Sequence, residues 1–417
     1  MIFSLAKQLG VARFRAAPRV VKVLSLQQFL EGFVPIMALY AIMFERVGGL
    51  TFEQIGLLFS IWSLGFLVTE LPSGVLADYW SRKYVIMLGG VLRAVGLTIW
   101  IVWPTFTGYA VGFALWGMMI ACVSGSVTAY LHTELGVLGK GKKYAKYYGW
   151  TMSARWLGTL LGYVIASVLT LRHTNALIGL SIAGSLLSAA VLITLPEHPY
   201  KKQDSYLKTL AAGLSEIVRS KKLRYMCYGL FSIYMVIGVI EELLPRLYAN
   251  FGLNDSAISI MLAVALIVTV LLLTRLESFV QFSLPKQMLC MVLAVGLLLG
   301  GLHLGGFDGS FLILLFSLIF QLFRPVFQHH VQEAATGNER ATVGSVPGLV
   351  GGIVGALAYI VIGKGAEFSN ERLSIGAYGT FWLAVFLLLA YMGRKYRLGN
   401  HHSPVELAET GQPTIQF

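Results

Sequence analysis

Charged residues are scarce in this sequence. They make up 12% of its 417 residues, whereas about 25% is usual for a soluble domain. Hydrophobic residues make up 56%, and the mean hydropathy is +0.72. The shortage of charge excludes an ordinary soluble enzyme, and the surplus of hydrophobic residues excludes a disordered chain. The sequence therefore predicts a membrane protein.

Cysteines and enzyme motifs are also sparse. The three cysteines, Cys122, Cys227 and Cys290, each lie within an apolar run. Their odd number and wide spacing support neither a disulfide framework nor a zinc site. The sequence has no Gly-x-x-x-x-Gly-Lys-[Ser/Thr] phosphate loop, no nucleophile elbow and no His-Glu-x-x-His motif. We therefore expect no enzyme activity, no cofactor and no bound metal.

Long apolar runs dominate the chain. A membrane-crossing helix needs about 20 mostly apolar residues. The runs lack the alternation of a membrane β-barrel strand. The first run follows twenty mixed residues without a small-residue cleavage site, which argues against a signal peptide. The sequence predicts an all-α membrane protein with twelve transmembrane helices, at residues 21–44, 51–77, 83–103, 107–131, 149–170, 175–195, 224–248, 256–275, 285–303, 309–331, 342–363 and 375–393.

The basic residues predict the orientation of these helices. Of the 32 Lys and Arg residues, 24 fall on the side that carries both termini, five fall on the other side and three lie within spans. The positive-inside rule then places both termini in the cytoplasm. The net charge of +12 is spread over these loops, which favours attraction to anionic lipid headgroups over nucleic-acid binding.

The longest connection divides the chain into two sets of six spans. We expect an N-terminal bundle at 1–195, a linker at 196–223 and a C-terminal bundle at 224–397. Apolar residues recur at helical spacing among charged ones in the linker and within 3–15, which predicts amphipathic helices on the membrane surface. A plain solvated segment is the alternative for both. Polar residues dominate 398–417, which we expect to be a disordered tail.

A faint repeat relates the two halves. Glu31 stands four residues before Pro35 in the first span, and Glu241 stands four residues before Pro245 in the seventh. Spans four and ten both end in a stretch that combines histidine with glutamate. Matched positions in two halves are typical of a duplicated six-helix unit.

The loop between the second and third spans carries a recognisable motif. Gly74 is followed by Asp78, and then by Arg82 and Lys83. This spacing after the second of twelve helices resembles the signature loop of the major facilitator superfamily. Glu70 before the motif and the segment that begins at Arg340 resemble a bacterial branch with many efflux proteins. The resemblance implies two pseudo-symmetric six-helix bundles in a bacterial inner membrane.

The same resemblance implies a cytoplasmic gate around this loop. Gly74 would allow a close helix approach, and Asp78 would meet a helix N-terminus, where a negative charge is favoured. Arg82 would pair with a carboxylate such as Glu134, and Glu70 would belong to the same cytoplasmic gate. The alternative is a loop that is merely rich in positive charge.

Two features of proton-antiporting drug exporters are missing. Residues 115–126 of the fourth span contain no arginine, and residues 158–162 of the fifth contain no Gly-Pro pair. The second segment instead spaces two glycines four residues apart, a helix-packing pattern. These differences weaken the assignment as an antiporter and leave the fold assignment intact.

Carboxylates within the spans are candidate coupling groups, because a charge in the bilayer is costly and usually functional. Glu31 lies near mid-depth of the first span, with Gln27 and Gln28 one turn away. A desolvated carboxyl group can exchange a proton near neutral pH. We expect Glu31 to bind a proton or substrate, with a structural ion pair as the alternative. Glu241 and Glu242 are adjacent, so we expect one of them to face a cavity.

Other polar and aromatic residues within or near the spans have open roles. Arg93, Arg155 and Arg324 are structural counter-ions, contacts for an anionic substrate or residues that extend to the interface. The histidines near the ends of spans four and ten are candidate proton relays, and aromatic residues are candidates for the cavity wall. The candidate relay consists of His132, His329, His330, Glu134 and Glu333. The candidate wall residues are Tyr40, Trp62, Trp116, Tyr163, Tyr234 and Phe327.

These observations favour a monomeric secondary transporter of a small molecule, coupled to protons or another ion. Efflux of an amphipathic compound by proton antiport is the preferred hypothesis. Proton-linked uptake of an anionic nutrient or siderophore is the main alternative, motivated by the arginines. A non-transporting sensor or scaffold is a remote alternative, because it usually needs a larger soluble domain than any loop provides here.

Overall fold

The computed structural model describes residues 17–196, 206–335 and 340–395, and every regular element within these ranges is a helix. The first part contains α2 (Arg19–Gly32), η1 (Pro35–Ala38), α3 (Tyr40–Arg46), α4 (Phe52–Tyr79), α5 (Arg82–Val102), α6 (Phe106–Val137), η2 (Gly141–Lys143), α7 (Tyr144–Leu169), η3 (Leu171–His173), α8 (Thr174–Val191) and η4 (Leu192–Thr194). The remainder contains α9 (Tyr206–Arg219), α10 (Lys221–Asn250), α11 (Asp255–Leu273), α12 (Leu276–Val280), α13 (Leu284–Leu304), α14 (Gly306–Ala334), α15 (Arg340–Phe368) and α16 (Glu371–Lys395).

Polar side chains set several helix starts. A helix satisfies its backbone polar groups internally, which lipid requires, but its first N–H groups need other acceptors. Thr51 and Gln54 form a reciprocal capping box at α4. Ser81 caps α5 in the same motif loop that the sequence singled out, and Asn254 caps α11.

Eleven of the twelve predicted spans are confirmed as single long helices, and the first is different. Among the described residues, eleven helices are long and apolar enough to cross a membrane. The remaining predicted run, 21–44, is covered by α2, η1 and α3 together. It is broken because Pro35 has no N–H and disfavours helical geometry at Val34, whose φ and ψ are −131° and 78°.

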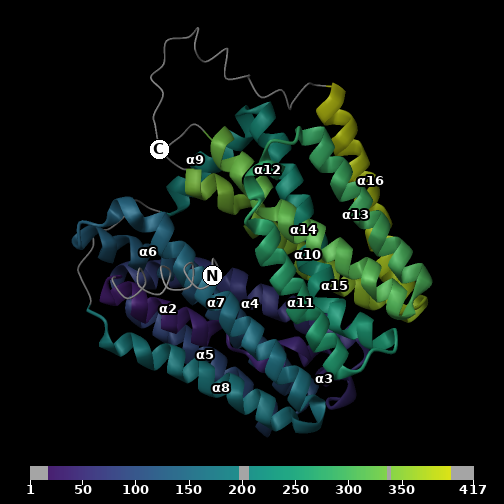
Figure 1. The fold of residues 1–417 in the computed structure, drawn as a ribbon, viewed down its shortest axis with the longest axis horizontal. Helices are drawn as coiled ribbons and strands as arrows, with labels where there is room; N and C mark the ends of the chain where they lie inside the picture. Colours follow the sequence, from purple (N-terminus) through teal and green to yellow (C-terminus); the bar gives the residue numbers. More distant parts are fainter. Residues whose placement is uncertain (1–16, 197–205, 336–339, 396–417) are drawn as a thin grey trace, which may run out of the picture.

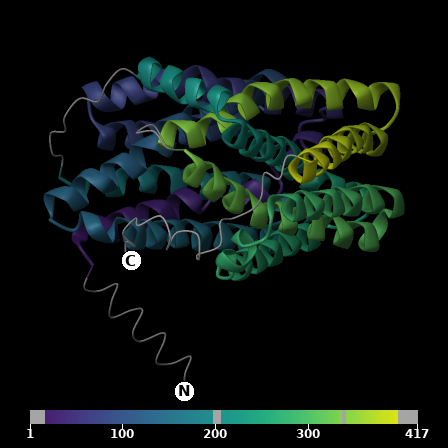
Figure 2. The ribbon, with the colours of Figure 1, turned by 90° about the horizontal axis from the view of Figure 1, so that it is seen from above.

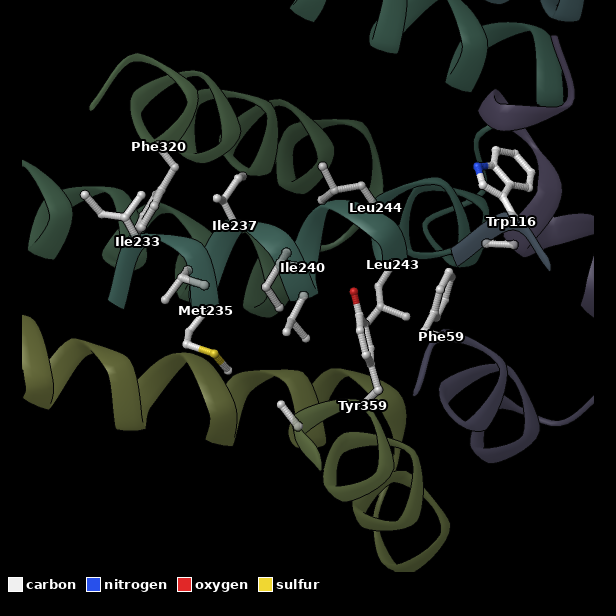
Figure 3. Packing of buried hydrophobic residues seen from close by; sticks show 14 of the residues in the cluster. Phe59, Trp116, Ile233, Met235, Ile237, Ile240, Leu243, Leu244, Phe320 and Tyr359 are labelled. Atoms are coloured by element: carbon white, nitrogen blue, oxygen red, sulfur yellow. The ribbon is translucent and has the colours of Figure 1, made fainter. Parts of the chain in front are cut away.

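The two sets of six spans form two bundles that lie side by side (Figures 1 and 2). Helices α2 to α8 form the N-terminal half, and α10 to α16 form the C-terminal half. Helix α10 lies deep in the C-terminal half: Figure 3 shows Ile233 beside Phe320 of α14, and Leu243 beside Tyr359 of α15. The Tyr359 ring also contacts Phe59 of the N-terminal half, with centroids 5.1 Å apart. This packing brings α10 next to the interface between the halves.

Helix α9 lies within the predicted linker between the halves, where the sequence predicted an amphipathic helix. Exposed Leu214 and Val218 stand on its described portion. The segment 3–15 and the tail 398–417, for which a surface helix and disorder were predicted, lie outside the described residues. The proposed boundaries at 195, 223 and 397 stay predictions.

The N-terminal half is packed backbone to backbone around its first helix. A Cβ atom added to Gly158 of α7 would lie 2.0 Å from the Phe29 carbonyl oxygen of α2. A Cβ atom on Gly32 would lie 2.2 Å from the Arg155 carbonyl oxygen of α7. Only glycine fits at either position, because so short a contact would force the helices apart. This close approach places Glu31 and Arg155 on neighbouring helices at the same level.

One end of the molecule is fastened by ion pairs, and we call it the latched end. Arg246 Nη1 of α10 lies 2.6 Å from Glu45 Oε2 of α3, which ties the two halves together. Arg246 also forms an ion pair with Glu371 of α16. A second pair across the halves joins Arg46 Nη1 to Asp255 Oδ1 at 2.8 Å.

Helices α4 and α15, one from each half, also hold the latched end closed. The Ser60 hydroxyl donates to the Ala356 carbonyl at 2.7 Å, and the Ser63 hydroxyl donates to the Gly352 carbonyl at 2.8 Å. Hydrogen bonds from side chain to backbone require close contact between the two helices. The two halves therefore meet tightly at this end.

Candidate functional site

A cavity of about 420 Å³ lies between the halves, which is within the usual size range of small-molecule sites. Helices α2 to α7 line it on one side, and α10, α11 and α14 line it on the other. All six predicted charged residues of the membrane interior reach it: Glu31, Arg93, Arg155, Glu241, Glu242 and Arg324.

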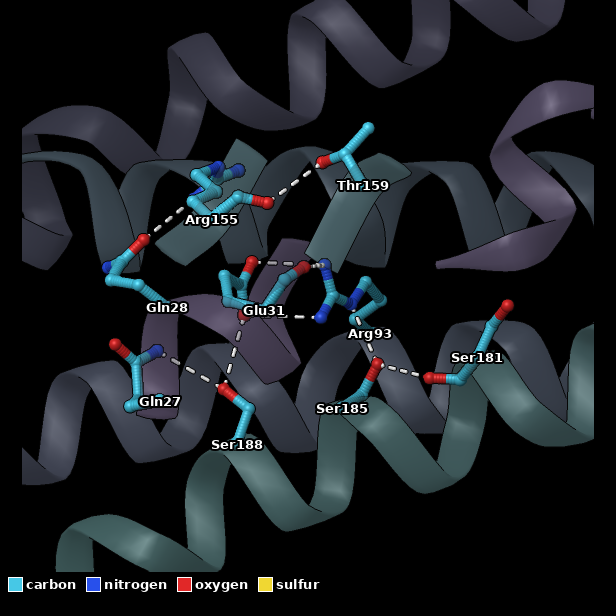
Figure 4. Close-up of polar contacts among 9 residues, drawn as sticks. All are labelled: Gln27, Gln28, Glu31, Arg93, Arg155, Thr159, Ser181, Ser185 and Ser188. Carbon is cyan, nitrogen blue, oxygen red and sulfur yellow. Dashed lines mark hydrogen bonds and ion pairs between the residues drawn. The ribbon is translucent and has the colours of Figure 1, made fainter. Parts of the chain in front are cut away.

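Glu31 and Arg93 form a buried ion pair in the wall of the cavity (Figure 4). Arg93 Nη1 donates to Glu31 Oε1 at 3.0 Å, and Nη2 donates to Oε2 at 3.1 Å. The two residues are only 1% and 2% exposed. A two-pronged contact of this kind fixes the guanidinium against the carboxylate. Of the roles predicted for Arg93, the geometry fits the counter-ion.

Serines of α8 complete the surroundings of this ion pair, as Figure 4 shows. The Arg93 Nε atom donates to Ser185 Oγ at 2.7 Å, and the Ser188 hydroxyl donates to Glu31 Oε2 at 3.3 Å. Gln27 Nε2 in turn donates to Ser188 Oγ at 3.1 Å. Such bonds are needed because a buried charge is costly unless it is both paired and hydrogen-bonded.

The broken first span adds its own backbone to this network. Arg93 Nη1 also donates to the Glu31 backbone carbonyl at 3.0 Å. Beyond the break, the backbone N–H of Ile36 donates to Ser181 Oγ at 3.3 Å. Polar side chains thus bind backbone groups that the interrupted helix leaves free.

Arg155 and Arg324 are placed differently from Arg93. Arg155 Nη1 donates to Gln28 Oε1 at 3.3 Å (Figure 4). Arg324 interacts electrostatically with Glu241. Neither forms an ion pair at contact distance with any carboxylate in the part of the chain that the structure describes. Both guanidinium groups therefore retain unused donors at the cavity.

The two carboxylates of α10 bind neutral donors. Gln321 Nε2 of α14 donates to Glu241 Oε1 at 2.5 Å. The Tyr40 hydroxyl of α3 donates to Glu242 Oε2, a contact that crosses from one half to the other. Both carboxylates line the cavity, although the sequence predicted that only one of two adjacent residues would. They both reach it because Glu241 points toward α14 and Glu242 toward the N-terminal half.

The predicted gate residues gather around the start of α5, with one difference. Arg82 Nη1 donates to Thr133 Oγ1 of α6 at 2.9 Å, next to the buried Glu134. Lys83 Nζ donates to the Leu195 carbonyl at 3.0 Å. The expected close approach at Gly74 is wrong for this conformation, because no atom of the described residues outside its own helix lies within 4 Å of a Cβ added there.

Three other gate residues have less defined surroundings. The side chains of Asp78 and Arg340 lie outside the described part of the structure. Glu70 has a buried carboxyl oxygen, Oε2, without a hydrogen-bond partner among the described residues. The function of this group as a gate stays a prediction.

The three histidines predicted as a proton relay each make a separate local contact. His132 packs edge-on against Tyr144. His329 Nε2 lies 3.5 Å from Glu333 Oε1, and His330 Nε2 lies 2.9 Å from Gln287 Nε2. Within the described ranges, no group of three or more His, Cys, Asp or Glu side chains is arranged to hold a metal.

Aromatic residues form much of the remaining wall. Of the six predicted, Tyr40, Trp62, Trp116 and Tyr163 line the cavity, whereas Tyr234 and Phe327 do not line it. The sequence did not single out Gln321 or the serines of α8. One signal for the serines was available: Ser181, Ser185 and Ser188 lie at i, i+4 and i+7 and so mark a polar stripe on an apolar helix.

Comparison with known proteins identifies the fold. The family model of the major facilitator superfamily matches residues 24–359. An uncharacterized MFS-type transporter of Methanocaldococcus jannaschii is 23% identical over 293 residues, which cover 69% of this chain and 73% of that protein. Among solved structures, the nucleoside transporter NupG is similar with a TM-score of 0.71 at 18% identity, over 89% of this chain and 96% of that one.

Two further solved structures share the fold. A D-xylose–proton symporter matches with a TM-score of 0.68 at 13% identity, over 89% of this chain and 96% of that one. A POT family transporter in complex with 5-aminolevulinic acid matches with a TM-score of 0.71 at 14% identity, over 91% of this chain and 96% of that one. The family match covers most of the chain, and the twelve spans, the two halves and the central cavity agree with it. The protein is a multi-pass membrane protein that belongs to the major facilitator superfamily of transporters.

Proposed function

We propose that this protein is a proton-coupled secondary transporter in which Glu242 carries the proton. The observation behind the proposal is the hydrogen bond between Glu242 and Tyr40, which joins the two halves inside the cavity. Loss or gain of a proton on Glu242 changes this bond, and movement of the halves breaks it. The same group thereby links protonation to alternating access.

The surroundings of Glu242 favour it over Glu31 as the proton carrier. Removal from water disfavours a charged carboxylate, and a nearby cation restores the charge. Glu31 has such a cation, Arg93, at both oxygens. Glu242 forms no ion pair at contact distance with any described cation. The earlier expectation that Glu31 couples transport to protons remains testable beside this one.

The proposal includes the orientation of the protein in the membrane and the conformational state of the structure. With both termini in the cytoplasm of a bacterial inner membrane, the latched end faces outward and the loop from Gly74 to Lys83 faces inward. The excess of Lys and Arg on that side supports this orientation. One structural neighbour is named as a proton symporter, so the fold accommodates proton coupling. In this state the cavity is closed to the outside.

The test begins with a screen for transported compounds. Drugs and metabolites are tested for protection or sensitisation of an efflux-deficient bacterial host that expresses the protein. Protection supports the expected efflux of an amphipathic compound, and sensitisation supports uptake. Compounds from either group are then added to proteoliposomes that contain the protein and a trapped pH-sensitive dye.

The proposal predicts that Glu242→Gln loses proton coupling and keeps compound exchange. This variant is expected to exchange the compound across the membrane without a gradient, while compound-driven proton flux falls at least tenfold. Glu277→Gln, which alters an exposed carboxylate of α12, is the matched control and is expected to behave as the wild type. Undiminished proton flux in Glu242→Gln contradicts the assignment. Loss of flux in Glu31→Gln alone moves the assignment to Glu31, and compound exchange without proton flux in the wild type rejects proton coupling.

A further inference from the structure

We infer that the transported molecule is a ring-bearing organic monoanion, whose acidic group binds between Arg155 of the N-terminal half and Arg324 of the C-terminal half. This inference rests on the proposed function, because it uses the protonated state of Glu242. It also names the substrate class that the proposal leaves open. Three features of the cavity carry it: its charge balance, its two available arginines and its aromatic wall.

The charge balance of the cavity changes when Glu242 is protonated. Three glutamates and three arginines line the cavity, and with all six ionised their charges cancel. One proton on Glu242 leaves the cavity with a net charge of +1. A site with one excess positive charge and little water favours a ligand with one negative charge. A carboxylate matches this requirement, whereas a phosphate monoester carries about −1.5 to −2 near neutral pH.

Two of the three arginines are available to such a ligand. Arg93 donates its hydrogen bonds to Glu31 and Ser185. Arg155 makes one side-chain hydrogen bond, to the neutral Gln28. Arg324 interacts with Glu241 only at longer range, and that carboxylate accepts from Gln321 instead. A planar guanidinium offers paired donors that match the two oxygens of a carboxylate.

The walls around these arginines suit a flat apolar body. Trp62, Trp116, Trp156 and Tyr163 line the cavity together with Phe113. Aromatic side chains favour stacked or edge-to-face contacts with another ring. A volume of about 420 Å³ fits a small molecule with one ring system.

The placement of the arginines has a consequence for coupling. Because Arg155 and Arg324 belong to opposite halves, an anion bound to both draws the halves together around itself. The proton on Glu242 creates the charge that the anion neutralises, so proton and anion bind together and move in the same direction. An inward proton gradient then drives uptake, which favours the alternative function over efflux.

The test measures binding at equilibrium, with no gradient, to the purified full-length chain in detergent. The probes are 3-phenylpropionate, 3-phenylpropionamide and 3-phenylpropylamine, which share a ring and differ in charge. Isothermal titration calorimetry is expected to show at least tenfold tighter binding of the carboxylate than of the amide, and no binding of the amine. The reason is that hydrogen bonds between charged groups are stronger than those to a neutral amide.

Variants locate the site. Arg155→Gln and Arg324→Gln are each expected to weaken carboxylate binding at least tenfold and to leave amide binding unchanged. Arg275→Gln, which alters an exposed arginine outside the cavity, is the matched control. The melting temperature of each variant without ligand reports folding, and a lysine replaces the arginine where the glutamine variant is unfolded.

The inference is overturned if the amide or amine binds as tightly as the carboxylate, if no probe binds, or if both arginine variants bind the carboxylate normally. These outcomes are separate from the test of proton coupling. Failure of anion binding with intact Glu242-dependent proton flux rejects the substrate class alone. Intact anion binding without proton flux rejects the proposed coupling alone.

Discussion

The two halves of the molecule treat a buried carboxylate in opposite ways. In the N-terminal half, Glu31 binds Arg93 and Ser188 and is almost fully buried. In the C-terminal half, Glu242 lines the cavity and accepts a hydrogen bond from Tyr40 of the other half. A glutamate in the first span of each half thus has a different environment. In general, a cation in contact favours the charged form of a carboxylate, and removal from water disfavours it.

Individual glycine positions in the two halves also differ in how closely they are packed. Glycines of the N-terminal half, such as Gly32 and Gly158, touch neighbouring backbones. Gly301 and Gly309 of the C-terminal half also touch each other's backbone, whereas a Cβ added to Gly238 of α10 meets no atom of the described residues outside its own helix within 4 Å. The N-terminal ion pair therefore sits beside closely packed backbones, while α10 has open space beside Gly238.

The largest expected effect comes from breaking the N-terminal ion pair. Arg93→Met leaves Glu31 buried without its cation, which is expected to lower the free energy of unfolding by about 3–5 kcal/mol. Denaturation of the purified protein in detergent measures this loss. The double variant Glu31→Gln with Arg93→Met is the control and is expected to recover most of it, because no unpaired charge remains. Wild-type stability of Arg93→Met would show that the pair does not hold the N-terminal half together.

A smaller effect is expected from the glycine contacts. Gly158→Ala places a methyl group 2.0 Å from the Phe29 carbonyl oxygen, which forces α2 and α7 apart. Overpacking of this kind is expected to lower the free energy of unfolding by about 1–3 kcal/mol. Gly238→Ala is the matched change in the C-terminal half and is expected to be neutral or slightly stabilising. Equal losses in both variants would mean that the packing at these two positions does not differ.

The smallest effect is expected at the interface between the halves. Arg246→Met removes the ion pair to Glu45, which is expected to open the latched end more often. Ser60→Cys, in a background with the three native cysteines replaced by alanine, reports this opening, because Ser60 is 2% exposed when the end is closed. Labelling by a membrane-impermeant maleimide is expected to rise about tenfold, which corresponds to about 1.4 kcal/mol.

Arg372→Met provides the control for the latched end. Arg372 lies over the Phe251 ring at 4.6 Å, and both residues belong to the C-terminal half. This variant removes a similar charge at the same end without a contact between the halves. Its labelling rate is expected to match that of the Ser60→Cys reporter protein without an arginine change. Equal rates in both arginine variants would mean that the Arg246–Glu45 pair does not hold the end closed.

Much of the fold could be predicted from local properties of the sequence. Each apolar run must form a helix in lipid, because no water is available for its backbone, and the motif from Gly74 to Lys83 is read directly from residue types. The break in the first span was also present in the sequence as Pro35. It was missed because four other prolines, such as Pro72 and Pro245, stand inside continuous helices. A proline alone does not determine whether a helix breaks.

The candidate site was predictable in its membership but not in its pairings. Six charged residues deep within the spans were singled out from the cost of charge in a membrane, and all six line the cavity. Which carboxylate meets which arginine depends on the rotation of each helix about its axis, and contacts between distant helices set that rotation.

The sequence by itself determined the membrane class, the twelve spans, the family and the set of buried charges, because each follows from composition or from residues close together in the chain. Only the tertiary structure decided that Arg93 neutralises Glu31, that Tyr40 reaches Glu242 across the halves and that Arg155 and Arg324 stay available. These pairings join residues from 62 to 202 positions apart. They arise because glycine contacts, a proline break and the closure of the latched end place particular helix faces against each other.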